Sequence, residues 1–110
     1  MSTYRSIEWR DGMVRMLDQR VLPQQTIYLD YTDYQQVAAA IREMVIRGAP
    51  AIGAAAAYGL ALTAHHSQAE DVETLRAELE TAAKVLREAR PTAVNLFWAE
   101  RDVYSSEIFL

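Results

Sequence analysis

The sequence contains no cysteine among its 110 residues. Disulfide bonds, thiolate metal sites and a cysteine nucleophile are therefore excluded within this chain. It also has no excess of basic residues, because the formal net charge is -4 at pH 7. No overall positive field draws such a chain to nucleic acid or to an anionic membrane. We expect neither partner, although a local arginine site for a small anion is compatible with this charge balance.

Long apolar runs and signal-like segments are also missing. A membrane span needs about 20 consecutive apolar residues, and the most apolar stretch of this chain is shorter. The first six residues lack the apolar run of a signal peptide. We therefore expect a cytoplasmic protein.

Several catalytic signatures are absent as well. The sequence has no Ser-His-Asp set, no Walker loop, no dinucleotide glycine fingerprint and no interleaving of aromatic and basic residues. His65 and His66 are adjacent, so on a helix their side chains would point about 100° apart and make a poor metal pair. We expect them to be solvated residues at a helix end, and we expect no metal site. No catalytic constellation is complete within this chain.

The residues that are present predict one modest α+β domain, or part of a larger one. Hydrophobic residues make up 51% of the chain, enough for a core. Residues 7–31 indicate a small antiparallel β cap of about three strands. Asp11-Gly12 between two apolar runs is a strong hairpin signal, and residues 26–31 alternate with β-branched and aromatic side chains.

A four-helix core is predicted to follow the β cap. The expected helices cover about residues 33–47, 50–65, 69–89 and 91–103. Thr32 or Asp33 would cap the first helix, and Gly48 would be the left-handed residue just beyond its end. Residues 67–70 have the capping-box pattern and would open the third helix. Phe97 and Trp98 are expected in the core.

The second predicted helix is the centre of this arrangement. It starts at Pro50 and is apolar or small on every side, so neighbouring elements must cover all its faces. Arg47 stands three residues before Pro50, and Arg90 stands immediately before Pro91. Each proline is suited to the first turn of a helix. If the two helix starts converge, their N–H groups and two guanidinium groups could surround one phosphate.

A second interpretation of the two arginines is purely structural. Both follow a predicted helix, and an arginine there stabilises the last carbonyl groups by a few tenths of a kcal/mol, roughly. The spacing alone does not separate this role from anion binding.

Four segments make the chain recognisable. They are residues 7–9 (Ile-Glu-Trp), 17–20 (Leu-Asp-Gln-Arg), 40–53, which end in Arg47-Gly48-Ala49-Pro50-Ala51-Ile52-Gly53, and 90–98, which begin Arg90-Pro91-Thr92. In this order they resemble the amino-terminal region of the methylthioribose-1-phosphate isomerase family. This family shares a superfamily with the regulatory subunits of translation initiation factor 2B and with ribose-1,5-bisphosphate isomerases.

The resemblance implies an aldose–ketose isomerisation in methionine salvage, in which methylthioribose 1-phosphate becomes methylthioribulose 1-phosphate without a metal or organic cofactor. It places substrate binding on Arg47, Gly48, Ala49 and Arg90. It also implies a homodimer for the intact family protein. The catalytic cysteine and aspartate of the family belong to a Rossmann-like carboxy-terminal domain that this chain does not contain. We therefore expect an amino-terminal domain over residues 1–110 that is inactive alone.

Three further interpretations stay open. The chain could be a non-enzymatic regulatory module of the initiation-factor type, part of a protein similar to ribose-1,5-bisphosphate isomerase, or a gene remnant without activity. Residues 100–110 depart from the family pattern, which a truncated or frameshifted reading would produce.

Overall fold

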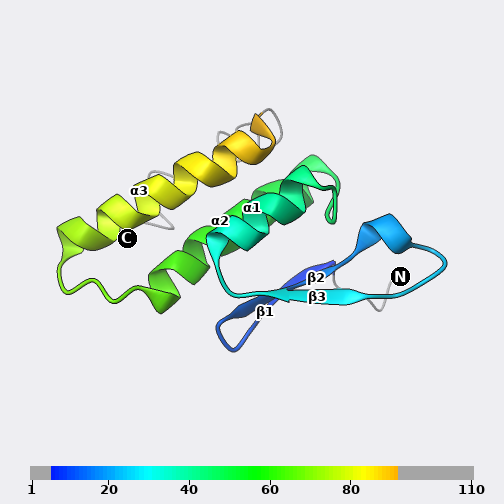
Figure 1. Cartoon of the computed structure of the whole chain (residues 1–110), viewed down its shortest axis with the longest axis horizontal. Coiled ribbons are helices and arrows are strands. Elements are labelled where there is room, and N and C mark those ends of the chain that lie inside the picture. The colour runs from blue at the N-terminus through cyan, green and yellow to red at the C-terminus, as the bar shows by residue number, and fades with distance from the viewer. Residues whose placement is uncertain (1–5, 92–110) are drawn as a thin grey trace.

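The structure, a computed structural model, describes residues 6–91. It contains a three-stranded sheet and three α-helices, and the predicted α+β class is confirmed. The helix expected over about residues 91–103, with Phe97 and Trp98, lies outside the described residues. Figure 1 shows the sheet on one side of the molecule, α1 (Tyr34–Arg42) and α2 (Ala49–His66) next to it, and α3 (Val72–Ala89) on the side away from the sheet.

The sheet forms as its turn residues predict. Strands β1 (Ile7–Arg10), β2 (Met13–Leu17) and β3 (Tyr28–Tyr31) are antiparallel in the order β1-β2-β3. Between β1 and β2, Asp11 and Gly12 have φ of 50° and 79°. Positive φ at both central residues is the conformation of a type I′ turn, which matches the twist of the flanking strands.

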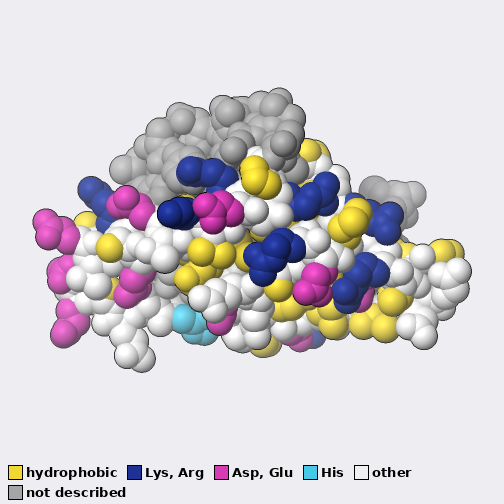
Figure 2. All heavy atoms as spheres, turned by 45° about the horizontal axis from the view of Figure 1, so that its top comes forward, with side chains coloured by type: hydrophobic (Ala, Val, Ile, Leu, Met, Phe, Trp, Pro, Cys, Tyr) yellow, Lys and Arg dark blue, Asp and Glu magenta, His cyan; other side chains and the backbone are white. Residues whose placement is uncertain are grey.

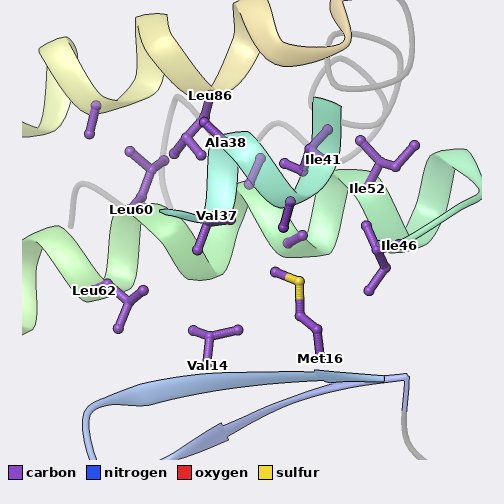
Figure 3. Packing of buried hydrophobic residues seen from close by; sticks show 14 of the residues in the cluster. Val14, Met16, Val37, Ala38, Ile41, Ile46, Ile52, Leu60, Leu62 and Leu86 are labelled. Carbon is purple, nitrogen blue, oxygen red and sulfur yellow. The ribbon is translucent and has the colours of Figure 1, made fainter. Parts of the chain in front are cut away.

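The core joins the sheet to all three helices. Val14 and Met16 point from β2 towards the helical layer, in which Ile41 lies on α1 and Leu60 on α2, and Leu86 of α3 packs on the side of this layer away from the sheet (Figure 3). All five are at most 1% exposed. The apolar α2 lies in the middle and contacts β1, β2, α1 and α3, so its neighbours cover the faces that cannot meet water.

The first helix ends earlier than predicted, at Arg42 and not at about residue 47. Met44 has φ of 65°, its N–H donates to Ile41 O, and the N–H of Val45 donates to Ala40 O. These two bonds define a Schellman motif with a left-handed residue at C′. The assignment of Gly48 to that position was therefore wrong. The burial of Val45 as the residue after C′ accounts for the early end.

The start of α3 also differs from the prediction. Asp71 caps this helix, and its carboxylate accepts from Thr74 N at 2.6 Å. The predicted capping box at residues 67–70 is wrong, because Ser67 ends α2 and its hydroxyl donates to Glu78. Val72, the first residue of this helix, is 69% exposed although it is apolar.

Candidate functional site

The segment 43–48, between α1 and α2, carries the first two predicted site residues. Val45 and Ile46 are buried, whereas Arg47 and Gly48 are exposed. The carbonyl of Val45 accepts from Gln19 N at 2.9 Å. The segment is therefore attached to the core and to the β cap at its centre, and it presents Arg47 to solvent just before α2 begins.

Gly48 is the N-cap residue of α2 and has φ of 89° and ψ of 135°. This conformation is open almost only to glycine. Apart from its two chain neighbours, no heavy atom of residues 6–91 lies within 4 Å of the position that a Cβ would occupy there. The requirement for glycine therefore comes from the backbone and not from packing, and the space beside the first turn of α2 is open.

The start of α2 differs from the other two helix starts. Asp33 caps α1 by accepting from Gln35 N and Gln36 N, and Asp71 caps α3. Gly48 gives α2 no side-chain cap, and the first turn of α2 has no acidic residue. The first N–H groups of a helix lack intrahelical partners and carry partial positive charge. This helix start can therefore receive an anion.

Ala49 and Pro50 form the beginning of this first turn. Pro50 has no N–H to satisfy, and the first intrahelical bond runs from Ile52 N to Gly48 O at 2.9 Å. The small side chain of Ala49 leaves the backbone accessible. Anion binding here would use the main chain, with Arg47 as the neighbouring positive charge.

Arg90 lies at the same end of the helical layer. It is the C-cap of α3 and is partly buried. The two 18-residue helices α2 and α3 run antiparallel, with the end of α3 near the start of α2 (Figure 1). Ser67 contacts Glu78, and Gly59 lies against Leu86. If both helices keep this register, Arg90 lies level with Ala55 of α2. Measured along the helix axis, it is then about 9 Å from Ala49, the first residue of α2.

Of the two arginines predicted to stand at helix ends, one does so in the structure. Arg90 is at the end of α3, but Arg47 follows α1 by several residues and lies outside its last turn. The structural role proposed for an arginine at a helix end therefore applies to Arg90 and not to Arg47.

Charge is unevenly distributed along the molecule. Figure 2 shows Asp and Glu side chains gathered at the end where α3 begins, and Lys and Arg side chains more frequent towards the middle and the opposite end. Glu70, Asp71 and Glu73 are exposed at the acidic end. The open start of α2 is therefore away from the main acidic cluster.

A charged network beside segment 43–48 was missed at the level of sequence. Asp18 is 4% exposed and makes a bidentate ion pair with Arg20, both N–O distances being 2.9 Å. The hydrogen bonds from Arg20 lower the pKa of Asp18. Arg20 also lies 3.6 Å from Glu43. The available signal was the Asp-x-Arg spacing within residues 17–20, a segment that supported the family resemblance without receiving a role.

The two histidines pack more closely than expected. The Nε2 of His66 lies 2.8 Å from Gly12 O, and the ring of His65 meets the ring of Trp9 edge-on at 5.4 Å. Both are exposed at the end of α2, as expected, and they also support the β1–β2 turn. Among residues 6–91, no three His, Cys, Asp or Glu side chains lie together in a way that could hold a metal ion.

An open groove lies at the other end of the helices, with a volume of about 600 Å³. It is lined by the start of α1, the end of α2 and the start of α3, including Asp33, His66 and Glu78. None of the predicted site residues lines it. Two carboxylates and no arginine or lysine make it unsuited to a phosphate.

Within the described part of the chain, no helix combines the length and apolarity needed to cross a membrane.

Comparisons with known proteins agree with the resemblance. A profile described as "Initiation factor 2 subunit family" matches residues 45–108. The chain is 58% identical over 95 residues to methylthioribose-1-phosphate isomerase of Syntrophotalea carbinolica, covering 86% of the chain and 28% of that protein. It is 54% identical over 97 residues to the Geobacter sulfurreducens protein of the same name, covering 88% and 28%.

Solved structures share the fold. The 5-methylthioribose 1-phosphate isomerase of Pyrococcus horikoshii superposes with a TM-score of 0.81 at 40% identity, covering 94% of this chain and 31% of that one. The translation initiation factor eIF-2B subunit delta of A. fulgidus gives 0.81 at 41% identity, covering 94% and 30%. This chain therefore spans about 28% of the length of the relatives quoted above. From the matching profile, the identities and the shared fold together, it belongs to the initiation factor 2 subunit family.

Proposed function

We propose that this chain is the phosphate-binding, amino-terminal part of a methylthioribose-1-phosphate isomerase, with Arg47, Gly48, Ala49 and Arg90 as the residues that hold the substrate phosphate. The observation that carries the site is the uncapped start of α2, which combines Gly48, free N–H groups and the adjacent Arg47. The reaction is assigned from the relatives of that name, which are 54–58% identical.

The proposed role is positioning. A phosphate at the start of α2 would accept hydrogen bonds from main-chain N–H groups and paired bonds from the two guanidinium groups. Fixing the phosphate fixes the adjoining sugar, and such orientation can supply several kcal/mol of an enzymatic barrier. Moving hydrogen between neighbouring sugar carbons also needs groups that exchange protons. In our proposal the family's cysteine and aspartate, outside this chain, supply that chemistry, and this chain alone has no turnover.

The proposed setting follows the same relatives. The intact protein would be a cytoplasmic homodimer that acts on a small sugar phosphate, without metal, organic cofactor, nucleic acid or membrane partner. Isolated chain, incubated with methylthioribose 1-phosphate, is expected to leave the substrate unchanged. Conversion by purified chain would contradict the proposal that this chain binds the phosphate while groups outside it exchange the protons.

A chimaera tests the site directly. Residues 1–99 of this chain would replace the matching region of the Syntrophotalea carbinolica isomerase, and turnover of methylthioribose 1-phosphate would be measured. We expect an active chimaera in which Arg47→Ala or Arg90→Ala lowers kcat/KM by about a hundredfold, since a charge-assisted pair is lost in each. Arg76→Ala is the matched control, because Arg76 is an exposed arginine near the opposite end of α3. Equal effects of all three substitutions would reject the site.

A second candidate function rests on the initiation-factor structure. The A. fulgidus protein named eIF-2B subunit delta matches the fold as well as the isomerase does. In this alternative the chain is part of a regulatory module that acts through protein contacts. An inactive but folded chimaera, together with recovery of translation factors by tagged chain, would favour it over the isomerase.

A further inference from the structure

Asp18 is the buried charged side chain among residues 6–91, and the proposed phosphate site does not use it. Its Oδ1 accepts from Arg20 N at 3.0 Å and from Arg20 Nε at 2.9 Å, and its Oδ2 accepts from Arg20 Nη2 at 2.9 Å. Burying a carboxylate is costly unless it is paired and hydrogen-bonded. Here both oxygens are satisfied by one residue two positions along the chain, so the carboxylate fixes the local backbone.

The backbone fixed in this way is the short 3-10 helix η1 (Gln19–Val21), which Asp18 caps. Gln19 lies between the two partners of the ion pair, and its N–H donates to Val45 O at 2.9 Å. The N–H of Asp18 donates to Ile27 O at 2.8 Å, which ties the same turn to the segment leading into β3. The ion pair therefore orients the amide that joins the β cap to segment 43–48.

Arg20 makes a second connection to this segment. Its Nη1 lies 3.6 Å from Oε1 of Glu43, the C-cap residue of α1. This contact is exposed, so it contributes little by itself. It does place the guanidinium beside the beginning of the segment whose centre is held by Gln19.

The distance from this attachment to the proposed site is short. Arg47 follows Val45 by two residues, which span at most about 7 Å of extended chain. Val45 and Ile46 are also buried, so movement of the Val45 carbonyl would displace Arg47 and the left-handed Gly48 together. Misplacement of a binding group by about 1 Å can cost a hundredfold in rate.

We propose that Asp18 and Arg20 are positioning residues for the phosphate-binding segment: their ion pair holds the amide of Gln19 against Val45 O and so sets the place of Arg47 and Gly48. This inference rests on the proposed function for its consequence in catalysis. The structural step, from ion pair to segment 43–48, can be measured without it.

The chain contains a matched control for this ion pair. Arg15 and Asp30 form the same bidentate pair, with N–O distances of 2.8 and 3.0 Å, between strands β2 and β3. Both side chains are about one-third exposed, and the pair joins β2 to β3. Loss of this pair should affect the sheet and leave the proposed site in place.

The first experiment uses the full 110-residue chain and amide hydrogen exchange read by NMR. In Asp18→Asn and in Arg20→Gln, we expect the amides of Gln19 and Val45, which donate to Val45 O and Ala40 O, to exchange about tenfold faster than in the wild type, relative to the amides of α3. In Asp30→Asn this ratio should stay unchanged. Arg20→Gln alters a partly exposed side chain and serves if Asp18→Asn fails to fold. Equal acceleration of all amides, or none at Gln19 and Val45, would overturn the proposal.

The second experiment places the same substitutions in the active chimaera. We expect Asp18→Asn and Arg20→Gln to raise KM by about tenfold with a smaller change in kcat, since binding geometry and not proton transfer is altered. Arg20→Lys keeps the charge and should recover part of the loss. If Arg47→Ala impairs the chimaera and these variants do not, the positioning role fails alone. If Arg47→Ala is also silent, the proposed function fails.

Discussion

At the scale of single residues, two positions between α1 and α2 decide the path of the chain. Met44 has φ of 65° and Gly48 has φ of 89°. A left-handed conformation costs a side-chain-bearing residue about 1 kcal/mol or more, whereas glycine adopts it freely. The segment therefore contains one glycine that its conformation requires and one methionine that its conformation disfavours.

Replacing the glycine by alanine and the methionine by glycine should have opposite effects on the free energy of unfolding. Gly48→Ala is expected to lower the free energy of unfolding by about 1–3 kcal/mol, although the added methyl group would meet no neighbour. Met44→Gly should raise it by about 0.5–1 kcal/mol, because glycine suits the C′ position of a Schellman motif. Urea unfolding of both variants measures the two signs. A neutral Gly48→Ala would show that the residue can adopt another backbone conformation.

Asp18 makes stability depend on pH in the acid range. Hydrogen bonds from Arg20 lower its pKa below the usual 3.8, so the unfolded chain binds the proton first as pH falls. The stabilisation is complete above about pH 4 and is lost as pH falls through the lowered pKa. The unfolding free energies of wild type and Asp18→Asn should therefore differ most near neutral pH and converge at acid pH. Urea titrations across this range test the expectation, and a constant difference would contradict it.

At the scale of elements, the helix starts show what the sequence could and could not predict. Thr32 or Asp33 was predicted as the cap of α1 and Asp33 is the cap, and the Asp11-Gly12 turn was also correct. The start of α3 was wrong because Ser67 and Asp71 are both good caps, and the choice depends on tertiary contacts. Ser67 is occupied by Glu78, so the helix starts at the later residue.

The two cap assignments for α3 predict different mutational effects. Asp71→Ala should lower the free energy of unfolding by about 1 kcal/mol, because Thr74 N loses its acceptor. Glu70→Ala, which would remove the partner residue of a capping box at Ser67, should be almost neutral. Thermal unfolding of the two variants compares them directly. A larger loss in Glu70→Ala would restore the earlier helix start.

At the scale of the whole molecule, the sheet and the helices share one core. Met16 of β2 is fully buried among residues from the helical layer, as Figure 3 shows. Neither layer can therefore lose its partner without exposing apolar surface, and small domains built in this way usually unfold in one step.

Cooperative unfolding can be followed from both layers. Trp98→Phe would leave Trp9 of β1 as the single tryptophan, since the chain has two. The fluorescence of Trp9 and the helical circular dichroism should then change at the same urea concentration. Met16→Ala should move both transitions together and cost about 2–5 kcal/mol. Separate transitions would mean that the β cap and the helices are independent units.

The architecture was predictable from the sequence, and the details of the candidate site only in part. Alternation in the strands and the apolar α2 indicated a β cap on a helical core. The short α1 was not predictable, because residues 45 and 46 continue a helical apolar pattern and leave the helix only to bury themselves beside Gln19. Asp18 was missed because its role depends on the contact between Gln19 N and Val45 O, which joins segments distant in sequence.

One consequence of the helix packing concerns the size of the anion that the proposed site would accept. Two methyl carbons of Leu86 lie 2.8 and 3.0 Å from where a Cβ on Gly59 would stand. A single hydrogen atom in the hydrophobic interior thus sets the gap between α2 and α3, and Arg90 follows Leu86 by about one helical turn. A larger residue at position 59 would push α3 away from α2 and so move the Arg90 guanidinium outward. In the proposed site, selectivity between small and bulky phosphoesters would then change while every charged side chain stayed the same.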